Sequence, residues 1–293
     1  MTGWVGDGGR HVAIGDTRLF VAERGSGFPI IVVHGGPGLD HHEFADYLDP
    51  LGDQFHLVLM DMRSQGRSDR TPPQTWTIQR MAEDISALAD ALGFTRYAVL
   101  GHSFGGFVAL VHAADQPAGV AATVVSGGVA SKDIMADVET ALAAIEPAAL
   151  REQLSSSWAR ESEVTTEEDF AEIVAEQMPF HFANPYDPRL GDYLDRAGAM
   201  VYSPDMLRHF ASVGYGELDA AGALAKVRHP VLVLAGRYDR VATAVAAAEA
   251  VAAADQDVIE LLVLERSGHM TFVEEQEHYL EVVREFLTRT CLT

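Results

Sequence analysis

Three polar side chains in this sequence each follow an apolar run, and their types suit acyl-transfer chemistry. Ser103 lies in the stretch Gly101-His102-Ser103-Phe104-Gly105-Gly106, directly after the apolar residues 97–100. The pattern G-x-S-x-G between a strand and a helix describes a tight turn that holds a serine oxygen away from the sheet. The glycines let the strand and the helix approach closely around that serine. The sequence therefore predicts that Ser103 is a nucleophile.

A serine nucleophile needs a base, and the base needs an acid that orients it. Asp239 follows the apolar run at residues 231–234, and His269 follows the run at residues 259–264. The three residues thus come at three strand ends in the order serine, acid, histidine. His278 is a weaker base because it falls inside a predicted helix, and Asp61 is a weaker acid because it precedes the serine. We expect Asp239 to orient His269, and His269 to take the serine proton.

Acyl transfer also requires N–H donors for the oxyanion that develops in the reaction. The backbone N–H of Phe104, the residue after the serine, is one candidate. The second is the N–H of Gly36 in His34-Gly35-Gly36-Pro37-Gly38, a loop that directly follows the buried apolar run at residues 30–33. We expect His34 to be a structural hydrogen-bonding residue of that loop.

The elements that carry these residues alternate between strands and helices. A hairpin is predicted at residues 11–22 around Gly15-Asp16, and a short helix at residues 44–51. A helix is predicted after Thr77, its N-cap, and Gly93 ends this helix. One face of the helix is apolar and consists of Ile78, Met81, Ile85, Leu88 and Leu92. Further strands are expected at residues 57–60 and 120–125, and a helix at residues 104–115. This alternation favours a parallel sheet wrapped by helices.

Between Gly127 and about Gly222 the strand-like runs disappear and helical patterns take over, punctuated by prolines such as Pro179. The expected helices there include residues 132–145, 148–158, 167–178 and 204–213; beyond them, helices are expected at 243–253 and 272–288. The predicted fold class is α/β: a mostly parallel, twisted sheet flanked by helices, formed by residues 1–127 and 222–293. Residues 128–221 are predicted to be an inserted, all-helical cap.

The composition restricts the partners and the location. With 43 acidic and 21 basic residues, the net charge of −22 argues against nucleic acid or an anionic membrane as a partner. No apolar run approaches the ~20 residues of a membrane helix. The first ten residues are glycine-rich without an apolar signal segment, so a cytoplasmic location is expected. The single cysteine, Cys291, cannot form an internal disulfide.

With these residues in place, the chain resembles the serine hydrolases of the α/β-hydrolase fold. The H-G-G-P-G loop and its continuation Leu39-Asp40-His41-His42-Glu43 resemble the proline iminopeptidase branch in particular. The resemblance implies a serine exopeptidase that removes an N-terminal residue, often proline, with no metal or organic cofactor. It also implies that carboxylates of the cap hold the substrate's free amine.

Two motifs depart from that branch. Its members usually have Trp after the nucleophile, where this chain has Phe104. They usually have D-Q-R-G-x-G-x-S, where this chain reads Asp61-Met62-Arg63-Ser64-Gln65-Gly66-Arg67-Ser68. Both local forms also occur in related esterases and lactonases. An aminopeptidase or amidase on small substrates or short peptides, a carboxylesterase or lactonase on apolar acyl substrates, and a hydrolase-fold binding protein without turnover therefore all stay open.

Specificity is expected to reside in the cap, which is rich in aromatic and acidic side chains. Phe180, Phe182 and Tyr202 are the residues predicted to line an apolar substrate pocket. For His181, between the first two, contact with the substrate is one interpretation, and a surface histidine is the favoured one. The acidic residues at helical surface spacing are expected to be solvated; they include Asp137, Glu139, Glu172 and Glu176.

Overall fold

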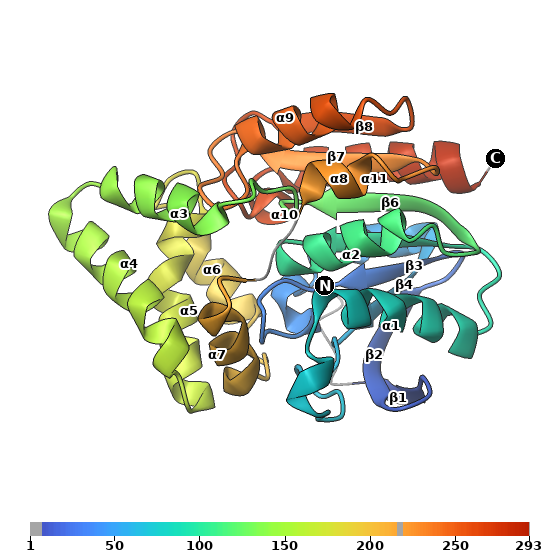
Figure 1. Cartoon of the computed structure of the whole chain (residues 1–293), viewed down its shortest axis with the longest axis horizontal. Helices are drawn as coiled ribbons and strands as arrows, with labels where there is room; N and C mark the ends of the chain where they lie inside the picture. The colour runs from blue at the N-terminus through green and yellow to red at the C-terminus, as the bar shows by residue number, and fades with distance from the viewer. Residues whose placement is uncertain (1–7, 216–218, 293) are drawn as a thin grey trace.

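A computed structural model describes residues 8–215 and 219–292 and contains an eight-stranded sheet in the order β1-β2-β4-β3-β5-β6-β7-β8 (Figure 1). The strands β1 and β2 run antiparallel to their neighbours, and all others are parallel. Their bounds are β1 Arg10–Ala13, β2 Arg18–Gly25, β3 Phe28–Val33, β4 Phe55–Met60, β5 Tyr97–His102, β6 Val120–Ser126, β7 Val231–Gly236 and β8 Ile259–Leu264. The mostly parallel sheet and its N-terminal hairpin are as predicted.

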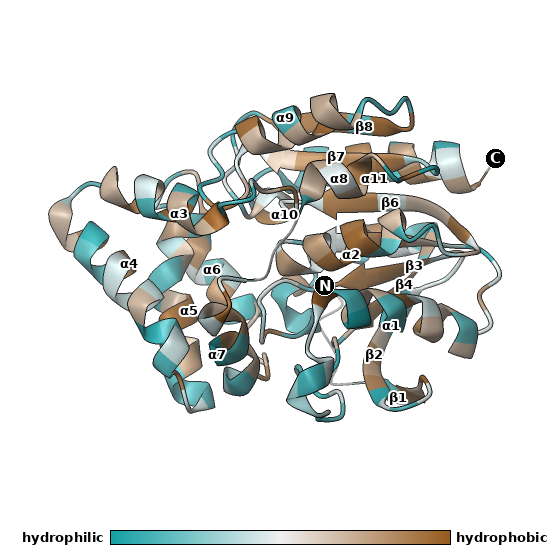
Figure 2. Ribbon diagram, in the orientation of Figure 1, coloured by the Kyte–Doolittle hydropathy of each residue, from teal (hydrophilic) through white to brown (hydrophobic). Residues whose placement is uncertain are grey.

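The central strands are apolar throughout because helices cover both faces of the sheet. In β3, residues Ile30, Ile31, Val32 and Val33 are each at most 1% exposed. Alternate residues point to opposite faces: Ile31 and Val33 join one core cluster, and Ile30 and Val32 join another. Figure 2 shows the same pattern, with apolar colouring concentrated on the strands.

One face of the sheet carries four helices: α1 Ile78–Ala91, α2 Phe104–Ala114, α8 Ala220–Leu224 and α9 Ala244–Ala254. The other face carries the C-terminal helix α11 Gln276–Cys291, which lies behind the sheet in Figure 1. Thr77 caps α1 as predicted, since its side chain accepts the N–H of Arg80. The buried face of α1 includes Met81, Ile85 and Leu88, which were assigned to it from their spacing.

Between β6 and β7, the described residues 127–215 form helices and turns and contain no strand. These helices are α3 Ile134–Ala143, α4 Ala148–Arg160, η4 Glu161–Glu163 (a 3-10 turn), α5 Glu167–His181, α6 Arg189–Arg196 and α7 Pro204–Ser212. In Figure 1 they lie beyond the carboxyl ends of the parallel strands. We call them the cap helices. The division into a core and a cap at residues 128–221 stays a prediction, and its second boundary falls within α8.

Three local predictions were wrong. The helix expected at residues 44–51 is instead two 3-10 turns, η1 His41–Phe44 and η2 Asp49–Asp53, the second of which begins around Pro50. Helix α5 continues through Pro179 to His181. The last helix is broken at Glu275 into α10 Thr271–Glu274 and α11, because Glu275 leaves the helical backbone region and its carboxylate accepts the Arg266 N–H and Ser267 hydroxyl.

None of the described helices combines the length and the apolar character needed to cross a membrane.

Candidate active site

The turn around Ser103 brings a strand and a helix into very close contact. Ser103 has φ 53° and ψ −122°, a strained conformation for a non-glycine residue that costs about 1–3 kcal/mol. Its N–H donates to the carbonyl of Ser126 at 2.9 Å, which ties the turn to β6. A Cβ on Gly105 would lie 2.3 Å from the carbonyl oxygens of Val33 and His34. Only glycine therefore lets α2 begin directly against β3, with Ser103 at the strand end.

The structure brings the three predicted polar residues together. Nε2 of His269 lies 2.8 Å from Oγ of Ser103, and Nδ1 lies 2.7 Å from Oδ2 of Asp239. The other oxygen of Asp239 accepts the N–H groups of Val241 and Ala242 at 2.8 and 3.0 Å. Because an ionised Asp239 only accepts, Nδ1 of His269 must carry the proton, and Nε2 is left to accept the Ser103 hydroxyl.

The charges around His269 favour its protonated form. Burial alone lowers the pKa of His269, but the charge and hydrogen bond of Asp239, with the charges of Glu43 and Glu274, raise it above its ordinary value. The two histidines whose rings lie nearest behave in the opposite way. Burial lowers the pKa of His181 to about 4 and that of His102 well below its usual range. His269 is therefore the histidine of this group that can gain a proton near neutral pH.

The C-terminal end of α5 holds the loops that carry Asp239 and His269. The His269 N–H donates to the carbonyl of His181 at 2.7 Å. Arg240 donates to three more carbonyls there, those of Phe180 at 3.0 Å, Phe182 at 2.6 Å and Ala183 at 3.0 Å. The position of His269 thus depends on a cap helix as well as on the sheet.

The loop that contains Gly36 is fixed by buried polar contacts. His34 is fully buried; its Nδ1 donates to the carbonyl of Gly35 and its Nε2 accepts the Met62 N–H, so it is the structural residue that we expected. Gly36 has φ +116°, which glycine adopts without strain. Gly36 and Phe104 both line the cavity at Ser103.

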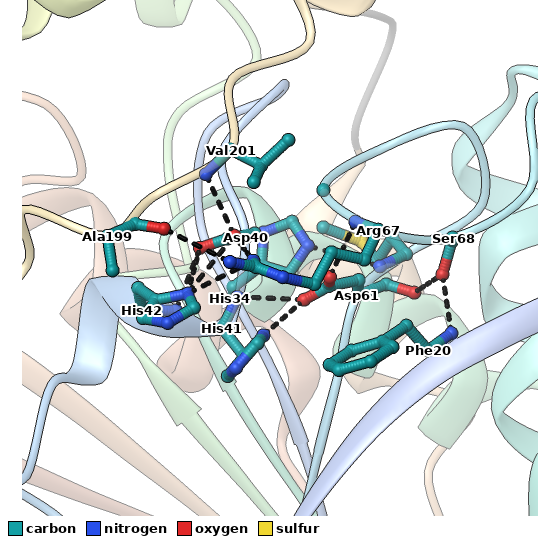
Figure 3. A network of polar contacts seen from close by, with 12 residues as sticks. Phe20, His34, Asp40, His41, His42, Asp61, Arg67, Ser68, Ala199 and Val201 are labelled. Carbon is teal, nitrogen blue, oxygen red and sulfur yellow. Dashed lines mark hydrogen bonds and ion pairs between the residues drawn. The ribbon is translucent and has the colours of Figure 1, made fainter. Parts of the chain in front are cut away.

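Just after this loop, Asp40 joins the core to the cap, as Figure 3 shows. The fully buried Asp40 carboxylate accepts the Val201 N–H at 2.9 Å and Nη1 of Arg67 at 2.6 Å. Arg67 also donates from Nη2 to the carbonyl of Ala199 at 3.2 Å. These contacts hold residues 199–201 of the cap beside the loop.

A cavity of about 130 Å³ opens above Ser103 and is enclosed by the cap helices. A cavity of this size fits a small substrate. Its floor includes Ser103, Phe104 and His269. Most of its wall is apolar or aromatic; among the residues that line it are Met135, Val138, Trp158, Phe170, Met178 and Met200.

Of the three residues predicted to line the pocket, Tyr202 does so, and Phe180 and Phe182 do not. Both phenylalanines are fully buried, Phe180 in the cap's own apolar cluster and Phe182 in the main core. Successive residues at the end of α5 point in different directions, so it is His181 between them that lines the cavity. The interpretation of His181 as a surface residue was therefore wrong.

Sequence reasoning missed two buried carboxyl groups of the cavity wall, Glu43 and Glu161, which are each 4% exposed. Burial raises the pKa of each to about 7. Glu161 accepts hydrogen bonds from Nε2 of Gln177 at 2.7 Å and from the hydroxyl of Tyr215. A signal was present for Glu161: the buried residues Leu150, Leu154 and Ser157 of α4 form a helical stripe that Glu161 continues.

The comparisons with known proteins agree with this architecture. Residues 29–276 match the family model described as the alpha/beta hydrolase fold. The proline iminopeptidase of Heyndrickxia coagulans is 26% identical over 279 residues, which cover 90% of this chain and 92% of that protein. The crystal structure of the Mycobacterium smegmatis proline iminopeptidase is 26% identical, with a TM-score of 0.73 over 97% of this chain and 99% of that one. An esterase from Exiguobacterium antarcticum shares the fold at 21% identity, with a TM-score of 0.73 over 96% of this chain and 99% of that one. This chain belongs to the alpha/beta hydrolase fold family and resembles its proline iminopeptidase branch.

Proposed function

We propose that this protein is a serine hydrolase that works through an acyl-enzyme. Ser103 attacks the acyl carbon, and its proton passes to Nε2 of His269, which then gives it to the leaving group. Asp239 holds His269 in the required tautomer and stabilises the imidazolium. The N–H groups of Gly36 and Phe104 bind the oxyanion, and a water activated by His269 releases the acyl group. The hydrogen-bonded chain from Asp239 through His269 to Ser103, at the floor of the cavity, carries this proposal.

The substrate class that we favour is a small amide or peptide with a free N-terminus, as for a proline iminopeptidase. Two observations support it: proline iminopeptidases align along nearly the whole chain, and the cap contributes a buried carboxyl group, Glu161, to an otherwise largely apolar cavity. A bound ammonium group would favour the ionised form of Glu161 and form an ion pair with this buried carboxylate. The exposed Glu172 and the surface pair of Glu176 with Arg160 cannot offer this.

The apolar cavity wall and Phe104 favour a second candidate, a carboxylesterase or lactonase for apolar acyl groups. The two candidates differ in whether a substrate amine is needed. Prolyl p-nitroanilide, its N-acetyl derivative and a short acyl p-nitrophenyl ester would be compared as substrates. For an aminopeptidase, acetylation should abolish anilide turnover, and Glu161→Gln should raise KM for the free anilide while leaving KM for the ester unchanged. Equal turnover of free and acetylated anilide would refute amine recognition.

The nucleophile itself is tested with a fluorophosphonate probe. We expect labelling of the wild-type protein at Ser103 and none of a folded Ser103→Ala variant. Absence of labelling on folded wild-type protein would favour the third candidate, a ligand-binding protein without turnover.

A further inference from the structure

Glu43 is a buried carboxyl group beside the nucleophile that the steps above leave without a role. It lies on the 3-10 turn η1, just after the loop that contains Gly36, and lines the cavity together with Ser103. Its Oε2 accepts the N–H of Gly35. A Cβ on Gly35 would lie 2.5 Å from Oε1 of Glu43 and 3.1 Å from Cβ of Ser103. The Glu43 carboxyl group and Ser103 therefore both lie next to the position that a side chain on Gly35 would occupy.

The charges that act on Glu43 come from several elements. Burial raises its pKa to about 7, the Gly35 N–H and the positive charge of His269 lower it, and the charge of Asp40 raises it. Burial raises the pKa of two tyrosines, Tyr193 and Tyr279, and the charge of Glu43 adds to the rise in both. The Gly35 N–H and the charge of His269 thus both favour an ionised Glu43, and the interaction between the Glu43 and His269 charges acts equally in the other direction.

We propose that Glu43 is a positioning residue of the active site: it fixes the Gly35–Gly36 backbone through the Gly35 N–H, and its carboxylate supports the imidazolium that forms on His269. This inference rests on the serine-hydrolase function proposed above. The loop that Glu43 holds carries the N–H of Gly36, one of the two oxyanion donors. One side chain thereby connects the oxyanion site with the charge of the base.

The pH dependence of the reaction should show this connection. Ser103 reacts when His269 is neutral, and proton transfer then makes His269 positive. An ionised Glu43 stabilises that positive charge. The rate should therefore rise with pH as both His269 and Glu43 lose a proton. The other groups that act on His269 are unchanged in a Glu43 variant; they are Asp239, Glu274, His102 and His181.

Phosphonylation of Ser103 by a fluorophosphonate measures this without knowledge of the natural substrate. The bond from Oγ to phosphorus forms, the bond from phosphorus to fluorine breaks, fluoride leaves, and the hydroxyl proton goes to His269. The second-order rate constant would be measured between pH 5 and 9 for the wild type, Glu43→Gln and Glu43→Leu. Glu172→Gln is the control, because it removes an exposed carboxyl group of the cap helix α5 that does not line the cavity.

Glu43→Gln keeps an acceptor for the Gly35 N–H but loses the charge. It should lower the plateau rate about fivefold and move the acid limb of the profile to lower pH by about half a unit or more. Glu43→Leu also loses the acceptor, so its plateau should fall at least another fivefold. Glu172→Gln should leave both the plateau rate and the pH of the acid limb at their wild-type values.

Superimposable profiles for the wild type and Glu43→Gln, with labelling intact, would overturn the inference and leave the proposed function standing. Failure of the wild type to label would overturn both. If neither Glu43 variant folds by circular dichroism, the wild-type acid limb decides: a slope steeper than one log unit per pH unit supports two ionisations, and a slope of one refutes them.

Discussion

Replacing Arg67 with methionine should destabilise the protein, because it leaves a buried carboxylate without its charge partner. The Asp40 side chain is fully buried, and that of Arg67 is 20% exposed. Removing one member of a buried ion pair costs about 3–5 kcal/mol. In the variant, Asp40 keeps the N–H groups of His42 and Val201, and the Nδ1 atom of His42 lies 3.1 Å from its carboxylate oxygens. Because these contacts remain and Arg67 is partly solvated, we expect the loss of stability to be at the lower end of this range.

We therefore expect Arg67→Met to lower the free energy of unfolding by about 3 kcal/mol. At about 2.1 cal/mol/K per residue, the unfolding entropy of a 293-residue chain is about 0.6 kcal/mol/K, so the melting temperature should fall by about 5 °C. Urea unfolding monitored by circular dichroism, together with a thermal melt, measures both. KM should also rise, since the cap segment held by Arg67 is adjacent to Met200 and Tyr202 of the cavity.

The double variant Asp40→Asn/Arg67→Met separates the charge from the side chain's volume. Asparagine can still accept the Val201 N–H, and no buried charge remains, so part of the lost stability should return. Arg10→Met is the control, because Arg10 pairs with Glu23 on the surface and such pairs contribute little. The reasoning fails if Arg67→Met is as stable as Arg10→Met, or if the double variant is less stable than Arg67→Met.

Three further predictions follow from single side chains. Ser103→Gly removes the backbone strain of a non-glycine residue at positive φ, so the free energy of unfolding in urea should rise by about 1 kcal/mol. The same variant should lose fluorophosphonate labelling. A lower free energy of unfolding would show that Ser103 is not strained. Burial lowers the pKa of His112 to about 3, so its contribution to stability, full above about pH 6.5, should decline by about 1.4 kcal/mol per pH unit on acidification. Melting temperatures from pH 7 to 4 should accordingly fall less steeply for His112→Phe than for the wild type, and parallel curves would refute this. Arg240→Met removes the donor to three carbonyls at and just beyond the C-terminal end of α5, and it should lower the phosphonylation rate about tenfold, with Arg240→Lys intermediate because it lacks the planar fork; an unchanged rate would show that this end of α5 does not position His269.

The positions of the strands along the chain, and the strand ends that carry Ser103, Asp239 and His269, could be predicted because each depends on local sequence. A buried parallel strand is a continuous apolar run, and the loop after it begins at the first polar or glycine residue. The runs at residues 97–100, 231–234 and 259–264 all lie within observed strands. Since parallel strands share one carboxyl edge, residues 166 positions apart could be expected to meet there.

The cavity wall could not be predicted in the same way. Whether Phe180, His181 or Phe182 faces the cavity depends on how α5 is rotated against the sheet. That rotation is fixed by contacts from distant segments, such as the three hydrogen bonds of Arg240. Aromatic residues occur both in the core of the cap and in the wall of a pocket, so the residue type does not distinguish the two positions.

Glu161 and Glu43 differ in whether the sequence carries a signal that predicts a buried carboxyl group. Glu161 continues a buried helical stripe, and a charged residue in such a stripe is costly unless it has partners or a function. Its partners Gln177 and Tyr215 come from two other segments of the chain, so their donated hydrogen bonds depend on how these segments pack against α4. Glu43 has no such pattern, because a 3-10 turn lacks a stripe, and its partner Gly35 is eight positions away in a loop. The residues that set the chemistry at Ser103 are local to strand ends, whereas those that would tune its charge and its substrate depend on tertiary contacts. For the function proposed above, we therefore expect a change of specificity to arise from changes in the cavity wall that leave the sequence around Ser103 untouched.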